Sequence, residues 1–184
     1  ESALEKYTES LEIRRALEQE LGTPQSRRDV SLSLNRVADI EPSQGNHESA
    51  LKKYTESLEI RLGLEQELGT PASRRDVSMS LAYVAGIELK LGKHESALAK
   101  YTESLEICRA LEQELGTPES RRDVSLSLEY VAGIEIQLGN HESALAKCQE
   151  SLEIRRALEQ ELGTPESRRD VSLSLDNVAD IELQ

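Results

Sequence analysis

Four glutamates at equal intervals are the side chains of this sequence best placed for acid–base chemistry. Each lies in line with the apolar residues of a helical pattern, at Glu41, Glu88, Glu135 and Glu182. Burial raises the pKa of a carboxyl group towards the range of a general acid or base. The alternative is structural ion pairing, which we favour because a catalytic site does not need four copies. The expected partners are arginines at the edge of another helix, Arg14, Arg61 and Arg155, which also have carboxylates four residues on at Glu18, Glu65 and Glu159.

Two cysteines stand where other repeats of the chain have arginine and tyrosine, at Cys108 and Cys148. They form no CxxC motif and no cluster with histidine, so they resemble the free thiols of a reducing compartment. On this basis we expect a cytoplasmic location.

Histidine, serine and arginine give no stronger indication of chemistry. His47, His94 and His141 recur at a turn and are expected to pack or cap there rather than to bind metal. Ser31 and Ser33 lack the partners of a catalytic triad, and no glycine-rich phosphate loop occurs. The repeated Arg27-Arg28 pair either forms ion pairs with nearby carboxylates, such as Asp29 and Glu20, or forms an isolated anion site. We favour ion pairing. We therefore expect no enzyme, no metal site and no cofactor.

Composition also narrows the class of protein. The chain has 184 residues, 37% of them hydrophobic, and it contains no Phe and no Trp. Such a composition suits a stack of small layers better than one large core. The net charge of −13 opposes binding to the phosphates of nucleic acids and to anionic membrane surfaces. We expect neither nucleic acid nor membrane among the partners.

An internal repeat is the main feature of the sequence. The segment ESALxK begins at residues 1, 48, 95 and 142, so the period is 47 residues. The repeats are therefore 1–47, 48–94, 95–141 and 142–184, and we treat residues 1–184 as a single repeat array. Of the 47 positions, 32 are identical in every copy that covers them. Each copy is too short to bury a core alone, so neighbouring copies must stack.

Two helical patterns occupy each repeat. In the first copy, residues 1–21 have apolar residues on one helical face, and Gly22-Thr23-Pro24 ends that helix. Ser26 is the expected N-cap of a second helix that extends to about residue 44. Gly45-Asn46-His47 turns the chain, with residue 46 or 47 near the next cap. The sequence thus predicts about eight antiparallel helices and no strands.

The turn and first helix of the repeats resemble the tetratricopeptide family. Gly92, Ala97 and Tyr101 match its Gly, Ala and aromatic positions. Leu81, Val84 and Ala85, in the second helix of the preceding repeat, match the family's packing residues in that helix. The match recurs over essentially the whole chain. The 47-residue period exceeds that of the family and resembles the long repeats of kinesin light chains. The resemblance implies an all-α, right-handed superhelical α-solenoid that binds protein partners.

Some residues depart from the family pattern. Cys148 replaces the aromatic residue in the last repeat, and Pro42 and Gln44 replace apolar residues in the first. Because proline lacks a backbone donor, Pro42 should loosen the end of its helix.

The residues that differ between repeats predict where a partner binds. Within the second helix of each repeat they fall in an arc of about 120°, the face that lines the concave groove in tetratricopeptide proteins. The predicted groove residues are Asn35, Asp39, Ala82, Gly86, Lys90, Glu129, Gly133, Gln137, Asp176 and Asp180. The acidic members favour a basic or mixed-charge peptide. The alternative is that solvent-facing residues simply drift, since the first helix also varies on its outward side.

A second hypothesis of another class is structural self-assembly. The array begins with a first helix and ends with a second helix, and both should expose apolar surface around Leu4, Leu11, Leu175 and Val178. Association through these end helices would give a homo-oligomer. The first hypothesis remains a protein-binding scaffold or adaptor.

Overall fold

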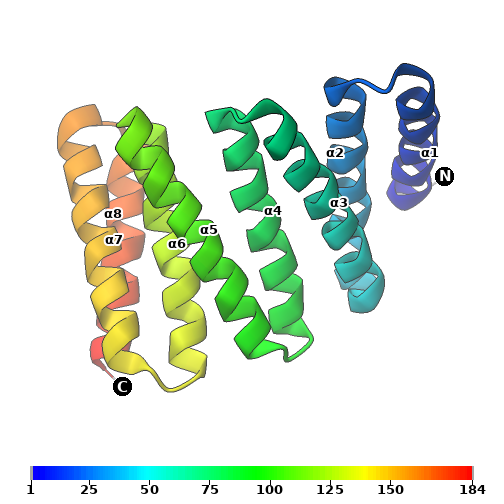
Figure 1. Ribbon diagram of the computed structural model, residues 1–184. Helices are drawn as coiled ribbons and strands as arrows, with labels where there is room; N and C mark the ends of the chain where they lie inside the picture. Colours follow the sequence, from blue (N-terminus) through cyan, green and yellow to red (C-terminus); the bar gives the residue numbers. More distant parts are fainter. Residues whose placement is uncertain (1, 184) are drawn as a thin grey trace. The chain divides into compact units, whose positions relative to one another are not determined.

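The computed structural model describes residues 2–183, and in this range it contains helices and no strand (Figure 1). Eight α-helices and one short 3-10 helix occupy residues 2–183. Their bounds are α1 Ala3–Leu21, α2 Pro24–Ile40, η1 Glu41–Gln44, α3 His47–Leu68, α4 Pro71–Lys90, α5 His94–Leu115, α6 Pro118–Gln137, α7 His141–Leu162 and α8 Pro165–Glu182. The predicted all-α class and helix number are confirmed.

The chain forms two compact units, Glu1–Ala97 and Leu98–Gln184, whose boundary lies within α5. In the first unit α1, α2, α3 and α4 pack in sequence, and in the second α6, α7 and α8 do so. Each unit therefore has the layered helix packing of an α-solenoid. Residues 94 positions apart occupy equivalent places in the two units, because 94 is twice the repeat period.

The second helix of the first repeat begins three residues earlier than the sequence suggested, with its N-cap at Thr23 and not at Ser26. Thr23 caps α2: its side chain accepts from the Ser26 backbone N–H, and the Thr23 N–H donates back to the Ser26 hydroxyl at 3.1 Å. The prediction of Ser26 as N-cap is thus wrong, since it is the N3 residue of this capping box. Pro24 fits the first helical turn because no intrahelical partner awaits its missing N–H.

Glycine and proline set the other helix ends. Gly22 adopts a left-handed conformation, with φ 57°, and its N–H donates to the Glu18 carbonyl, so α1 ends there as predicted. Pro42 breaks the next helix, as expected: α2 stops at Ile40 and continues only as the 3-10 helix η1, whereas α4 and α6 each run for 20 residues.

Small and apolar side chains fill the spaces between helices. In the first unit Leu11, Val30, Leu34 and Val37 form one buried cluster. In the second unit Ala132, Ala144, Cys148 and Ile181 form another. Buried serines also lie within each unit, and in the first unit the Ser57 hydroxyl of α3 donates to the Ser31 carbonyl of α2 at 3.1 Å. Such small residues allow the helices to approach closely, which explains how a chain without Phe or Trp builds a packed interior.

The same three exposed ion pairs tie the helices of each unit. In the first unit arginines on α1 and α2 reach α3 and α4, through Arg15–Glu56, Arg27–Glu67 and Arg28–Asp76. The second unit repeats them as Arg109–Glu150, Arg121–Glu161 and Arg122–Asp170. Exposed pairs contribute little stability each, but they fix which carboxylates the arginines face. The prediction that Arg27 and Arg28 form ion pairs with carboxylates is confirmed. Their partners are Glu67 and Asp76, and not Asp29 and Glu20.

Candidate partner-binding face

The second helix of each repeat carries an exposed stripe that contains apolar side chains. In the first unit this stripe holds Leu32 and Arg36 on α2, and Met79 and Tyr83 on α4. Residues four apart on a helix lie above one another, so each helix presents a continuous surface. Met79 and Tyr83 are 42% and 39% exposed. We call these four residues the unit 1 stripe.

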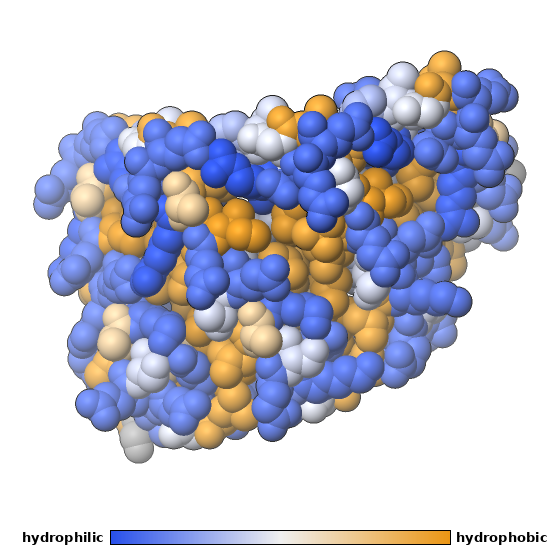
Figure 2. Space-filling view, viewed as in Figure 1, coloured by the Kyte–Doolittle hydropathy of each residue, from blue (hydrophilic) through white to orange (hydrophobic). Residues whose placement is uncertain are grey.

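The second unit presents the same positions. Leu126 and Tyr130 lie exposed on α6, and Leu173 lies exposed on α8 beside Asn177. Hydrophilic side chains cover most of the face seen in Figure 2, and hydrophobic ones show between them. Scattered exposed apolar residues are normal in proteins, but here they recur at one helical position in each described second helix.

Each unit contains a pair of stacked tyrosines that joins the stripe to the interior. Tyr54 of α3 stacks on Tyr83 of α4 with ring centroids 5.5 Å apart, and Tyr101 stacks on Tyr130 at 5.1 Å. The inner ring of each pair, Tyr54 or Tyr101, is buried, while the outer ring is exposed. Because the buried ring supports the exposed one from behind, the outer tyrosine is held rigidly at the surface.

The two inner tyrosines differ in their hydroxyl partners. The Tyr54 hydroxyl donates to the Asp39 carboxylate at 2.6 Å, with Asp39 on the exposed side of α2. Burial and this hydrogen bond raise the pKa of Tyr54 above its ordinary value. Burial, with a smaller contribution from Tyr130, raises the pKa of Tyr101 to about 12. Both hydroxyls are therefore protonated at neutral pH.

Most of the predicted groove residues lie at the surface. Asp39, Lys90, Gly133, Gln137, Asp176 and Asp180 are exposed, and Ala82 and Gly86 are partly exposed. Asp39 stands one turn from Arg36 on the unit 1 stripe. The apolar positions of the stripe, Leu32, Met79, Leu126 and Leu173, were missing from the predicted set. The sequence could have revealed these four positions, because an apolar residue recurs at the same place in each repeat although that place lies outside the buried helical face.

Asn35 and Glu129 do not line an open surface. Asn35 is 7% exposed, and its Oδ1 atom is buried without a hydrogen-bond partner. Glu129 is partly buried between α6, α7 and α8. Its Oε2 accepts from Arg155 Nη2 at 2.8 Å, and its Oε1 accepts from the Ser151 and Ser174 hydroxyls at 3.2 and 2.9 Å. A substitution of Glu129 therefore tests the stability of the unit before it tests partner binding.

Glu41 and Glu135 on the apolar face are paired, but not with the expected arginines. Glu41 accepts from Lys53 Nζ at 2.6 Å and from the Ser49 hydroxyl at 2.8 Å. Glu135 repeats this arrangement with Lys147 and Ser143. The predicted partners instead bind backbone carbonyls: Arg14 donates to Asp29 O, Arg61 to Asp76 O and Arg155 to Asp170 O. For Glu41 and Glu135 the prediction of arginine pairing is wrong, because the lysine twelve residues further along the chain lies nearer.

Histidines and cysteines occupy structural positions. His47, His94 and His141 are each the first residue of a helix, α3, α5 and α7. Cys108 is buried and receives a hydrogen bond from the Ser127 hydroxyl, with 3.4 Å between the oxygen and sulfur atoms. Burial, with the nearby Glu129 and Glu135, raises the pKa of the Cys148 thiol. Among residues 2–183, no group of three or more His, Cys, Asp and Glu side chains could hold a metal ion.

Known structures resemble the fold of this chain. No protein-family model matches the sequence, and no curated protein matches it. The structure is similar to that of BtubC (BKLC) from P. vanneervenii, with a TM-score of 0.69 and 21% sequence identity over 98% of this chain. The chain spans 66% of the length of the BtubC structure.

A second similar structure is the yeast histone chaperone Hif1, described as a scaffold protein recruiting protein complexes to core histones. Here the TM-score is 0.61 and the identity 10%, over 96% of this chain and 95% of Hif1. At such low identity these likenesses show the fold, a helical repeat, and nothing of the partners. In the described part of the chain, no helix is both long and apolar enough to cross a membrane.

Proposed function

We propose that this chain is a non-enzymatic scaffold of the tetratricopeptide kind, which binds a partner protein on the exposed stripes of its second helices. The observation that carries the proposal is the recurrence of exposed apolar side chains, with a supported tyrosine, at the same helical position. Large apolar and aromatic anchors ringed by polar groups are typical of protein interfaces. Repeat solenoids use such extended surfaces for binding.

The charge around the stripes indicates the kind of partner. Asp39 lies beside the unit 1 stripe, and Asp176 and Asp180 lie exposed on α8. With a net charge of −13 for the chain, a basic or mixed-charge peptide is the favoured ligand. Hif1, a similar structure, is named as a scaffold that recruits protein complexes to core histones, which agrees with a scaffold function here.

A peptide selection tests this proposal. Random peptides displayed on phage are selected against the protein, and the enriched peptides are titrated against two variants. We expect Leu32→Ser with Met79→Ser to weaken binding about tenfold, because each removes an apolar contact. The matched control, Ile13→Ser with Leu62→Ser, removes two exposed apolar residues from the first helices instead. Equal loss in both variants, or in neither, would contradict the proposal, with helicity checked by circular dichroism.

Self-association is the second candidate, and the exposure of α1 favours it. Tyr7, Ile13, Leu17 and Leu21 of α1 are all exposed, and so is Leu175 of α8. Leu11 is buried in the core and takes no part in this surface. Light scattering over a hundredfold concentration range distinguishes the two functions. A constant mass of about 20.5 kDa excludes self-association, whereas a concentration-dependent increase that Leu17→Ser abolishes would support it.

A further inference from the structure

A pocket lies in the first unit where α2 and α4 begin and α3 ends. Its volume is about 210 Å³, and it is open to solvent. Leu64 and Leu68 of α3 and Ala72 of α4 provide apolar lining, and Arg28, Arg61 and Asp76 provide the charged groups. An ordered water needs only about 10–15 Å³ of such space, so a ligand of several heavy atoms fits.

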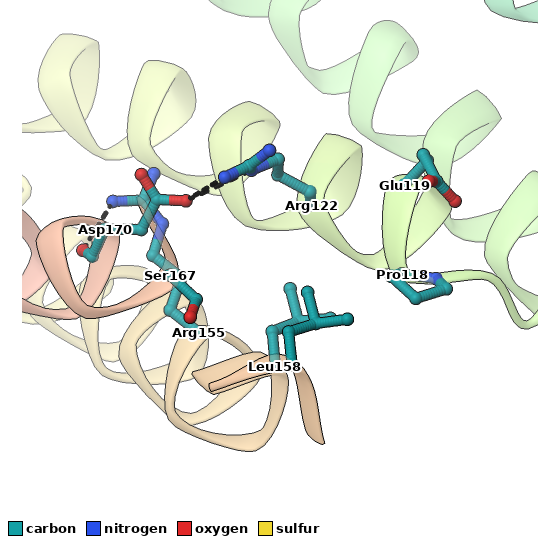
Figure 3. A pocket seen from close by; sticks show the side chains of 8 residues that line it. Pro118, Glu119, Arg122, Arg155, Leu158, Ser167 and Asp170 are labelled. Atoms are coloured by element: carbon teal, nitrogen blue, oxygen red, sulfur yellow. Dashed lines mark hydrogen bonds and ion pairs between the residues drawn. The ribbon is translucent and has the colours of Figure 1, made fainter. Parts of the chain in front are cut away.

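The second unit has a pocket at the equivalent place, but it is much smaller. Its volume is about 70 Å³, and its lining includes Arg122, Arg155, Leu158 and Asp170. In Figure 3 Arg122 extends towards Asp170, and Leu158 lies beneath this ion pair. The two pockets share the arginine pair, the leucines and the aspartate, so the residues that differ must explain the difference.

Carboxylates distinguish the two pockets. The second unit has Glu119 in the lining, and Glu166 lies 3.2 Å from Arg122. The first unit has Gln25 and Ala72 at these positions. The lining of the first pocket thus contains two arginines and one aspartate, a net charge of +1, whereas two arginines and two carboxylates balance in the second.

The buried arginine of each pocket also has fewer negative partners in the first unit than in the second. Arg155 is ion-paired with Glu129, which is absent from the first unit because Asn35 stands there. Arg61 is 3% exposed, and its Nε and Nη1 donate to neutral oxygens, Ser31 Oγ at 3.2 Å and Asp76 O at 3.0 Å. Burial lowers the pKa of Arg61, with the Asp76 carboxylate opposing this effect. A buried cation without its own carboxylate is costly and attracts an anion.

We propose that the first-unit pocket binds a small carboxylic acid, with its carboxylate at Arg28 and Arg61 and a short aliphatic chain against Leu64 and Leu68. The apolar lining favours a carboxylate on a hydrocarbon chain over a bare inorganic anion. The starts of α2 and α4 add positive dipole ends at this side of the pocket. The pocket shares no lining residue with the unit 1 stripe, so this proposal does not rest on the proposed protein binding.

Hexanoate is the probe for the first experiment. Its titration is followed by NMR of leucine methyl groups in the whole protein. We expect saturable shifts at Leu64 and Leu68, with weak affinity on the order of 1 mM for so small a ligand. The equivalent leucines of the second unit, Leu158 and Leu162, should not shift. Absence of saturable shifts at Leu64 and Leu68, or equal binding of hexanol, overturns the proposal.

Charge variants test the mechanism without disturbing the fold. Gln25→Glu is nearly isosteric, and Ala72→Glu installs the residue that the second unit already has, in the first turn of a helix where glutamate is favourable. The double variant should weaken hexanoate binding about tenfold or more. Ala72→Gln is the matched control, which adds the same volume without charge. If it weakens binding as much as Ala72→Glu does, the electrostatic basis is wrong.

The carboxylate could come from a free acid or from the last residue of a peptide. A pentapeptide ending in leucine with a free C-terminus is therefore compared with hexanoate and with the amidated peptide. Stronger binding of the free-ended peptide assigns the pocket to protein C-termini. Stronger binding of hexanoate assigns it to small acids. Equal binding of the amidated and free-ended peptides shows that the carboxylate is not recognised, which contradicts the proposal.

Discussion

Two helical layers of this protein have nearly the same sequence, but the buried arginine has a carboxylate partner in only one of them. We call them the Arg61 layer, formed by α2, α3 and α4, and the Arg155 layer, formed by α6, α7 and α8. In both, the arginine donates to a serine hydroxyl and to the carbonyl of the aspartate in the last helix. Only the Arg155 layer adds a carboxylate, that of Glu129.

The difference extends to the neighbouring polar atoms. In the Arg155 layer Glu129 accepts hydrogen bonds from Arg155, Ser151 and Ser174. In the Arg61 layer the Asn35 Oδ1 and Ser80 Oγ atoms are buried without a hydrogen-bond partner. Unpaired buried polar atoms cost free energy. The residue at position 35 or 129 thus decides whether the buried arginine has a carboxylate partner within its layer. With Asn35 it has none, and Arg61 remains a cation that an external anion can approach.

Removal of the Glu129 carboxylate should have the largest effect. Glu129→Ala leaves Arg155 buried without a charged partner and takes an acceptor from Ser151 and Ser174. We expect the free energy of unfolding to fall by about 3 kcal/mol, measured by urea denaturation. Amide exchange in α7 and α8 should identify the second unit as the site of the loss.

Asp176→Ala is the matched control for that prediction. Asp176 occupies the same repeat position as Glu129 but is exposed on α8. Its removal should change the free energy of unfolding by less than about 0.5 kcal/mol. If the two variants lose the same stability, the Glu129 network does not distinguish the layers.

The reverse change should repair the Arg61 layer. Asn35→Glu supplies a carboxylate to Arg61 and an acceptor to Ser80, as Glu129 does for Arg155 and Ser174. We expect the free energy of unfolding to rise by about 1 kcal/mol, the net value of a charge-assisted hydrogen bond after desolvation. Asn35→Gln, which adds length without charge, should not give this gain. A loss of stability with Asn35→Glu would show that Arg61 needs no counter-ion.

The fold could be predicted from the sequence because its determinants are local. The 47-residue period, the apolar helical faces and glycines such as Gly22 specify helices, ends and order without knowledge of tertiary contacts. The misplaced N-cap is instructive, since Thr23 and Ser26 can both cap. The proline between them decides, because Pro24 is favoured at the first helical position.

The candidate site was less predictable because it depends on the reach of long side chains. Periodicity places Glu41 on a buried face, but it does not show that Lys53, rather than an arginine, reaches it. Asn35 and Glu129 lie at the edge of the predicted arc, where a few degrees separate an exposed position from a buried one. A signal was present in the sequence, since each of these residues precedes an arginine, Arg61 or Arg155, by 26 residues.

The stacked tyrosines offer the mildest test of how the units differ. Burial raises the pKa of Tyr101 to about 12, and the Asp39 carboxylate raises that of Tyr54 further. The pKa of Tyr101 is raised only in the folded state, so the protonated hydroxyl contributes to the free energy of unfolding. This contribution is complete below pH 10, the ordinary tyrosine pKa. It is lost as the pH rises towards about 12. Asp39→Asn should lower the pKa of Tyr54 towards that of Tyr101 and leave Tyr101 unchanged, as followed by tyrosinate absorbance with Tyr54→Phe and Tyr101→Phe to assign the transitions. An unchanged Tyr54 transition would mean that burial alone sets its pKa, and that the Asp39 hydrogen bond does not distinguish the two units.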